Sequence, residues 1–369
     1  MSFLTSAKGR KSAWSFGAAT LLSISSLLLV ACSSDTGTDS GLSSESNSSS
    51  DANSSSLRNS MGQPDISGLW TNETLTRFER PARYGDRLVL TEEEVEQMEG
   101  GANERYEQAN QPTDPSEGAP TYKRVGGYNA FWAGNVNRVM RVAGEPRTSL
   151  ITYPANGRIP PRKADAPPEK TDGWHTIFFT PEVGDLTSYE TRSAVERCLF
   201  WPSQAGAVLH QGAYNANYQI VQAPDHVMIL AETIHDARII RLNSEHDPGS
   251  AVTRPWMGDS IGWYEGDTLV VETINYSPKQ YFHQASDELK VTERFTRVAP
   301  DRLHYAFKVE DPLVWEEPWG GEYEFHPSAG VYEYACHEGN YAMENALKIG
   351  RMQDEGLINP DNTQAPREQ

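Results

Sequence analysis

The chain has 369 residues and a formal net charge of −19, from 51 acidic and 32 basic side chains. A surface this acidic repels polyanions, which excludes DNA, RNA and anionic lipid headgroups as partners of the folded part. Nine Trp and sixteen Tyr provide enough aromatic surface for a sizeable core or for the walls of a binding cleft.

The N-terminus combines three basic residues within 8–11, an apolar run and small residues before a cysteine. This order is typical of a secretory signal. The run ends at Leu29-Val30-Ala31-Cys32, which resembles the bacterial lipoprotein box. The resemblance implies a signal peptide over 1–31 and lipidation of Cys32. Because Ser33 follows, it also implies forwarding to the outer membrane, where the protein is lipid-anchored and faces the periplasm or the cell surface.

An uncleaved transmembrane helix over 13–30 is the alternative. A span needs about 20 apolar residues, whereas this run is short and contains several serines. We therefore favour the lipoprotein. Removal of residues 1–31 takes away three basic residues and no acidic one, so the formal charge moves from −19 to −22.

Residues 32–63 are dominated by Ser with Asp, Asn and Gly, a composition that cannot bury a core. We expect a flexible tether here, and about 30 such residues span roughly 30 Å on average. The folded part is predicted as one β-rich domain with long loops over 64–351, followed by a polar tail over 352–369.

Two helices are predicted in the folded part. Thr91 and Glu94 fit a capping box, and the acidic residues at 92–94 suit a helix N-terminus. The second helix is predicted over 341–352.

Most of the remaining sequence predicts strands in hairpins. The strand pairs are 218–222 with 226–232, 261–264 with 268–274, and 289–298 with 302–309, and a further strand covers 237–242. Short loops between successive strands favour antiparallel neighbours, and so long a meander must close or cover its edges. The expected fold is mainly β, an antiparallel barrel or strongly curved sheet. Gly68-Leu69-Trp70 resembles the Gly-x-Trp strand of lipocalin-type barrels.

Two carboxylates share strand faces with apolar side chains. Glu293 alternates with Val291 and Phe295, and Glu272 lies between apolar residues in the same way. A carboxylate inside a barrel needs a partner or a raised pKa. These acids therefore either line a ligand cavity or pair with an arginine, such as Arg238 or Arg294. We favour the ion pairs, because structural pairs produce the same pattern.

The densest polar cluster covers 232–238. If the strand continues through it, Glu232, Asp236 and Arg238 face one way and His235 the other. His235 is then a candidate acid or base, oriented by Asp236 or Glu232, and Arg238 a candidate anion-binding residue. The alternative is a polar strand end without catalytic function, and the pattern does not decide between the two.

Residues 332–341 read YEYACHEGNY and resemble the closing motif of a widespread, largely uncharacterised family of secreted bacterial proteins. Further matching stretches are Glu196-Arg197-Cys198, 217–222, 234–238 and 265–273. The resemblance covers most of 147–341 and implies no activity. Within this motif, His337 and Glu338 are candidate ligand-binding residues.

Cys198 and Cys336 are the cysteines that remain after Cys32. Outside the cytoplasm they are a candidate disulfide, or they are separate buried thiols. Sequence spacing leaves both open, because bridging depends on a Cα separation within about 7 Å.

No cofactor and no metal are expected. The chain has no H-E-x-x-H, paired C-x-x-C, G-x-S-x-G, P-loop or Rossmann motif. A metal site assembled from His235, His337 and an acidic residue would not be visible in the sequence spacing. Trp256, Trp315 and Trp319 are candidates for ligand contact, although a role in the core explains them as well.

These patterns favour a lipoprotein whose barrel binds a small apolar or sugar-like molecule. The alternative is a cofactor-independent extracytoplasmic hydrolase, lyase or isomerase that uses the cluster around His235. An envelope scaffold is a third possibility. Binding is placed first because no catalytic motif is strong.

Overall fold

The computed structural model describes residues 57–111, 136–170, 187–212 and 214–358. The predicted signal peptide and Cys32 lie outside these residues, as does the tether up to residue 56. The described part contains three α-helices: α1 (Glu92–Ala109), α2 (Ser250–Thr253) and α3 (Tyr341–Asp354). Short 3₁₀ turns cover Ala82–Tyr84, Tyr189–Thr191 and Thr233–His235. Within the described ranges, we find no helix with the length and apolar character needed to span a bilayer.

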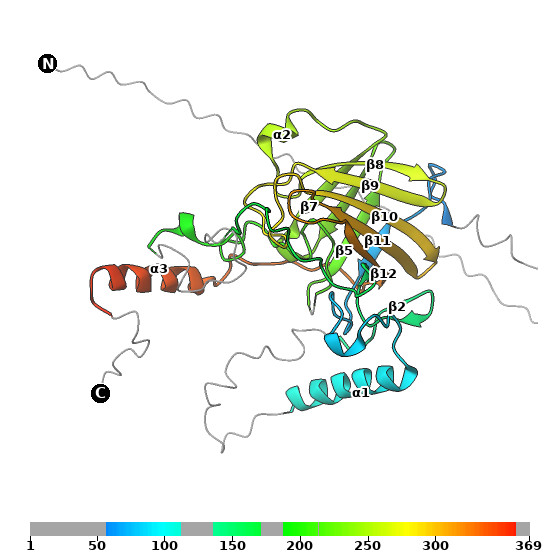
Figure 1. Ribbon diagram of the computed structural model, residues 1–369, viewed down its shortest axis with the longest axis horizontal. Coiled ribbons are helices and arrows are strands. Elements are labelled where there is room, and N and C mark those ends of the chain that lie inside the picture. Colours follow the sequence, from blue (N-terminus) through cyan, green and yellow to red (C-terminus); the bar gives the residue numbers. More distant parts are fainter. Residues whose placement is uncertain (1–56, 112–135, 171–186, 213, 359–369) are drawn as a thin grey trace, which may run out of the picture. The chain divides into compact units, whose positions relative to one another are not determined.

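Nine strands close into a barrel (Figure 1). In spatial order they are β1 (Gly68–Thr71), β5 (Asn217–Gln222), β6 (His226–Ala231), β7 (Ala237–Leu242), β8 (Asp259–Glu265), β9 (Thr268–Ile274), β10 (Lys290–Ala299), β11 (Arg302–Glu310) and β12 (Trp319–Pro327). The pairing of Trp70 with Pro327 closes the ring. The predicted β-barrel is confirmed.

Three short strands lie outside the ring. β4 (Ile151–Tyr153) pairs with β12, and β2 (Arg141–Val142) pairs with β3 (Glu145–Pro146). The helix α1 begins at the predicted capping box, in which Thr91 Oγ1 accepts from the Glu94 amide at 3.2 Å.

The predicted hairpins are present, but the meander is not antiparallel throughout. β7 and β8 are parallel, with Ile240 opposite Ser260 and Leu242 opposite Gly262. Residues 243–258 return the chain to the end of the barrel where β7 began, so β8 runs in the same direction. The expectation of antiparallel neighbours is wrong at this pair.

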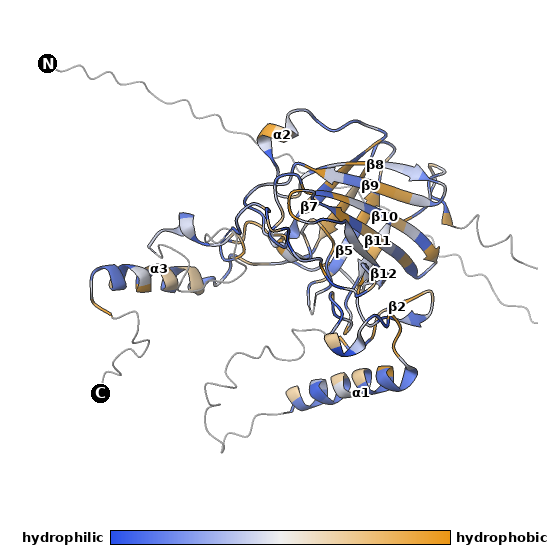
Figure 2. Ribbon diagram, in the orientation of Figure 1, coloured by the Kyte–Doolittle hydropathy of each residue, from blue (hydrophilic) through white to orange (hydrophobic). Residues whose placement is uncertain are grey.

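Hydrophobic and hydrophilic residues follow one another along the barrel strands (Figure 2), and their side chains alternate between the interior and the outer surface. On β10, Val291, Glu293 and Phe295 are buried, whereas Arg294 between them is exposed. This is the period of two expected of strands with one face in a core. One inward-facing set, at the centre of the barrel, contains the buried polar groups described next.

Candidate functional site

A buried ion pair lies inside the barrel. The Arg238 guanidinium donates two hydrogen bonds to the Glu293 carboxylate, at 2.6 and 2.9 Å, and Tyr305 Oη donates a third at 2.8 Å. Burial disfavours the charged guanidinium, but the Glu293 carboxylate raises the pKa of Arg238 above its ordinary value. Of the two arrangements considered for Glu293, the structure has the ion pair with Arg238.

The segment 204–210 fills the space beside this pair. Ala205, Ala207, Val208 and Leu209 are at most 1% exposed and belong to the main core. The Leu209 amide donates to Tyr305 Oη at 3.3 Å, while Asn72 Nδ2 donates to the Leu209 carbonyl at 2.7 Å. This inserted segment and the Arg238–Glu293 pair therefore occupy volume that a ligand inside the barrel would need.

Glu272 lies on the outer face of the barrel, away from Glu293. Its neighbours in register are Ile261 and Thr292, whereas Val271 opposes Glu293 on the inner face. Glu272 is therefore not part of an interior lining.

On this outer face, His246 is placed between two carboxylates. Its Nδ1 lies 2.9 Å from Asp259 Oδ2, and its Nε2 lies 3.3 Å from Glu272 Oε1. Lys290 Nζ is 3.5 Å from the other Glu272 oxygen. These contacts join β8, β9 and β10 with the crossover segment 243–258.

The cluster 232–238 is a turn rather than a continuous strand. Ile234 and His235 have φ values of 64° and 50°, in the left-handed region that reverses the chain between β6 and β7. The alternation of side chains predicted for a continuous strand over 232–238 is therefore wrong. His235 is exposed, and among the described residues no hydrogen bond joins its ring to Asp236 or Glu232. Arg238 lies inside the barrel, so the structure does not assemble these four residues into one site.

Glu232 is nevertheless a structured, buried carboxylate. It accepts hydrogen bonds from Asn215 Nδ2 at 2.6 Å, Asn217 Nδ2 at 3.0 Å and the Tyr332 amide at 3.0 Å. Burial, followed by the charge of Glu232, raises the pKa of Glu73 to about 7. The Glu73 carboxyl group therefore keeps its proton up to about neutral pH. No pattern in the sequence points to Glu73.

Asp236 follows the turn at 233–235 and lacks the set of hydrogen-bond donors that surrounds Glu232. Burial raises the pKa of Asp236, and its Oδ2 has no hydrogen-bond partner among the described residues.

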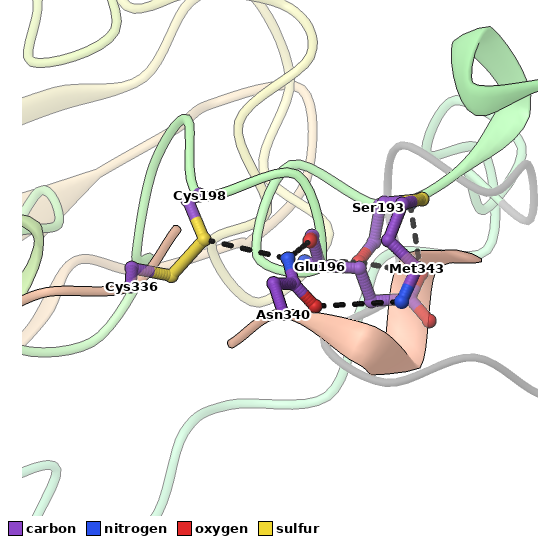
Figure 3. Close-up of a disulfide and its surroundings, with 6 residues drawn as sticks. All are labelled: Ser193, Glu196, Cys198, Cys336, Asn340 and Met343. Atoms are coloured by element: carbon purple, nitrogen blue, oxygen red, sulfur yellow. Dashed lines mark hydrogen bonds between the residues drawn. A yellow bond between two sulfur atoms is a disulfide. The ribbon is translucent and has the colours of Figure 1, made fainter. Parts of the chain in front are cut away.

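Cys198 and Cys336 form a disulfide with a Cα–Cα distance of 5.8 Å (Figure 3). Beside it, Asn340 Nδ2 donates to the Glu196 carbonyl at 3.1 Å, and Asn340 Oδ1 accepts from the Met343 amide at 3.4 Å. The bridge thus holds the start of α3 against the loop before residue 198. His337 and Glu338 are exposed in the turn between the bridge and α3.

The three tryptophans have different environments. Trp319 is fully buried in the core, and the half-buried Trp256 stacks on Phe200 with centroids 5.3 Å apart. Trp315 is 3% exposed and forms part of the wall of an open cleft.

The cleft has a volume of about 460 Å³ and lies at one end of the barrel, where β9 and β11 end and β10 and β12 begin. Its apolar lining consists of Ile274, Leu289, Pro312, Trp315 and Pro318. The polar lining consists of Asn275, Asp287, Glu288, Lys290, Glu310, Asp311, Glu316 and Glu317. Six carboxylates against one lysine give this cleft a strongly negative rim.

The contacts around Glu272 and His246 extend to one wall of the cleft through Lys290 and Asn275. Lys290, which binds Glu272, also lies 3.5 Å from Glu310 Oε2. Asn275 Nδ2 donates to Ser250 Oγ at 2.7 Å, and Ser250 Oγ in turn donates to Asp259 at 3.3 Å. One wall of the cleft is therefore fixed by the same contacts that hold His246.

Comparison with known proteins gives no family: no family model matches the chain, and no curated protein matches it either. Among the described residues, no three or more His, Cys, Asp or Glu side chains are grouped as metal ligands.

Proposed function

We propose that this chain is an outer-membrane lipoprotein that binds a small organic molecule in the cleft beside Trp315. The observation that carries the proposal is the cleft itself, which combines an apolar wall with polar groups at an accessible end of a rigid barrel. Its volume lies within the range of small-molecule sites, and it shares an apolar wall with them, while its eight polar residues make it more polar than most.

The barrel interior is a poorer candidate for the same function. Leu209 and its neighbours pack there. Arg238 and Glu293 are already paired with each other, so neither charge is free to bind a ligand. A ligand would have to displace these groups and leave buried charges unpaired, which is costly. Binding at the end of the barrel requires no such rearrangement.

The proposed anchor rests on Cys32 and the residues before it. Intact-mass spectrometry of the protein expressed in a Gram-negative host tests it. Cleavage before Cys32 with added acyl mass is expected, and Cys32→Ser should abolish both the acyl mass and recovery in the membrane fraction. An unmodified Cys32 in the wild-type protein contradicts the anchor.

Binding in the cleft is tested by NMR with a set of fragment-sized molecules that carry phenyl or cyclohexyl groups. Ile274→Trp places a large ring in the cleft without altering a charge, whereas Ile239→Trp places the same ring on the exposed outer face of β7. Fragments that bind the wild type should bind Ile239→Trp equally and Ile274→Trp at least tenfold more weakly. Equal binding to all three proteins contradicts the proposal.

A catalytic function is the second candidate, and the pair Glu73 and Glu232 favours it. Glu232 is held by three hydrogen-bond donors, while Glu73 has a pKa of about 7. A carboxyl group with a pKa near 7 can act as a general acid or base at neutral pH without a cofactor. Turnover of any extracytoplasmic ester or glycoside that is lost in Glu73→Gln, with the fold unchanged, would favour this function over binding alone.

A further inference from the structure

The carboxylates around the cleft are of two kinds. Glu310 is balanced by Lys308 Nζ at 2.9 Å and Lys290 Nζ at 3.5 Å. Asp311 is buried and accepts hydrogen bonds from Ser286 Oγ at 2.8 Å and from the Ser286 amide at 2.6 Å. These two acids therefore have structural roles within the protein.

The other four acids form no side-chain ion pair among the residues that the structure describes. They are Asp287, Glu288, Glu316 and Glu317, and all four are exposed at the rim. Two nearby cations bind main-chain carbonyls of the lining instead: Arg254 donates to the Asp287 carbonyl and Lys163 to the Pro312 carbonyl, each at 3.2 Å. The one lysine of the lining, Lys290, is held between Glu272 and Glu310 and does not approach them within ion-pair distance. Carboxylates that converge on a concave, low-dielectric surface focus a negative potential there.

The wall of the same cleft is apolar. Trp315 and Leu289 are nearly fully buried and form the wall together with Ile274 and two prolines. A bare metal ion would gain nothing from such a surface, since Ca²⁺ and Mg²⁺ require several oxygen ligands at short distances. A molecule with an apolar body removes from water the surface that Ile274, Pro312 and Pro318 still expose in front of Trp315 and Leu289, and this burial favours binding.

We infer that the molecule bound in this cleft is an organic cation with an apolar body, such as an aryl- or alkyl-substituted ammonium. This inference rests on the proposed binding function and specifies its ligand class. The apolar body contacts the wall beside Trp315, and the positive charge lies among the four unpaired carboxylates at the rim. Anionic molecules of the same size are repelled, and uncharged ones gain only the apolar contact.

Two probes of one shape test the inference on the full-length protein. Benzyltrimethylammonium carries the charge, and neopentylbenzene is its uncharged isostere. The cation is expected to bind at least tenfold more tightly at low salt. Its affinity should fall as NaCl is raised to 0.5 M, because salt screens exposed charges, while that of neopentylbenzene should not fall.

Glu316→Gln with Glu317→Gln removes two of the rim charges. Each lost carboxylate at about 6 Å should weaken cation binding roughly threefold, or about tenfold for the double variant. Glu344→Gln with Glu355→Gln removes two exposed charges on and beside α3, outside the cleft lining, and is the matched control, with no change expected.

The outcomes separate the inference from the function beneath it. One outcome is that both probes bind equally, that the rim variant does not change their affinity, and that Ile274→Trp weakens both. In that case the ligand class is overturned and the binding site stands. If 1 mM CaCl₂ displaces the cation and NaCl of equal ionic strength does not, a divalent-metal site replaces the inference. If Ile274→Trp affects neither probe, both the inference and the proposed function are overturned.

Discussion

The Arg238 guanidinium meets the Glu293 carboxylate inside the barrel in a bidentate ion pair, with nitrogen–oxygen distances of 2.6 and 2.9 Å. Tyr305 links this pair to the inserted segment, because its hydroxyl donates to Glu293 and accepts from the Leu209 amide. Ionic and apolar parts of the core are thus connected through the Tyr305 side chain, and the barrel interior is filled by the protein itself.

Glu293→Gln should destabilise the protein by about 3–5 kcal/mol, because it leaves the Arg238 charge buried without its counter-ion. Urea unfolding followed by fluorescence measures the change. Glu265→Gln is the control, since Glu265 and Arg294 form an exposed pair at 2.9 Å. Its expected cost is about 0–1 kcal/mol, and equal costs for the two variants would contradict the structural role of the buried pair.

Leu209→Ala should cost about 2–5 kcal/mol, because the barrel around the fully buried Leu209 cannot collapse completely into the space left. The same measurement on Leu313→Ala, where the leucine is about half exposed, should give less than about 0.5 kcal/mol. A cost for Leu209→Ala as small as that of the control would show that segment 204–210 does not fill the interior.

Glu73 should titrate with a midpoint near pH 7. Because its pKa is raised in the folded state, the folded protein keeps a proton that the unfolded chain has already lost. Stability should therefore fall as the pH rises from about 4.5, the ordinary value, through 7, and then level off. Carboxyl-carbon NMR measures the midpoint, and urea unfolding of Glu73→Gln should lack this pH dependence. A Glu73 midpoint below pH 5 would refute the assignment.

Glu232→Gln provides the companion measurement. Removing the Glu232 charge should lower the midpoint of Glu73 while leaving part of the shift, since burial is its larger cause. An unchanged midpoint would mean that the two carboxyl groups do not interact.

Replacing Cys198 and Cys336 with Ser should cost about 2–5 kcal/mol. The loss should be felt first at the start of α3, which the bridge holds through Asn340 and the Glu196 carbonyl. Hydrogen exchange at the Met343 amide should accelerate at least tenfold, whereas the Glu94 amide in the α1 capping box should be unaffected. Unchanged protection at Met343 would contradict this role of the disulfide.

The strands and helix starts follow from local patterns, and the sequence predicts most of them. Alternation identified both partners of every predicted hairpin, and Thr91 with Glu94 identified the start of α1. The strand β12 was not predicted because Pro318 and Gly320-Gly321 indicate a turn. In the structure, a Cβ on Gly321 would lie 2.0 Å from the Leu150 carbonyl oxygen, so glycine permits the close approach of β4.

The site was less predictable, because strand parity does not say which face is inside. Glu272 and Glu293 both alternate with apolar residues, yet only Glu293 points into the barrel. His246 and Glu73 belong to no motif, and their partners lie far away along the chain. The positive φ angles at Ile234 and His235 are imposed by the tertiary fold. The sequence gives no sign of them at Ile234, because a β-branched residue rarely adopts this conformation.

The central claim is that the cleft beside Trp315 is where this protein binds its ligand. The most direct measurement is the ¹⁵N-indole NMR spectrum, with the Trp315 signal assigned by Trp315→Phe, during titration with the tightest-binding fragment of the set. The Trp315 signal should shift and saturate, while that of Trp263, near the β8–β9 turn at the far end of the hairpin from Ile274, should stay in place. A saturating fragment that shifts Trp263 or other indoles, and leaves Trp315 unmoved, would contradict the account.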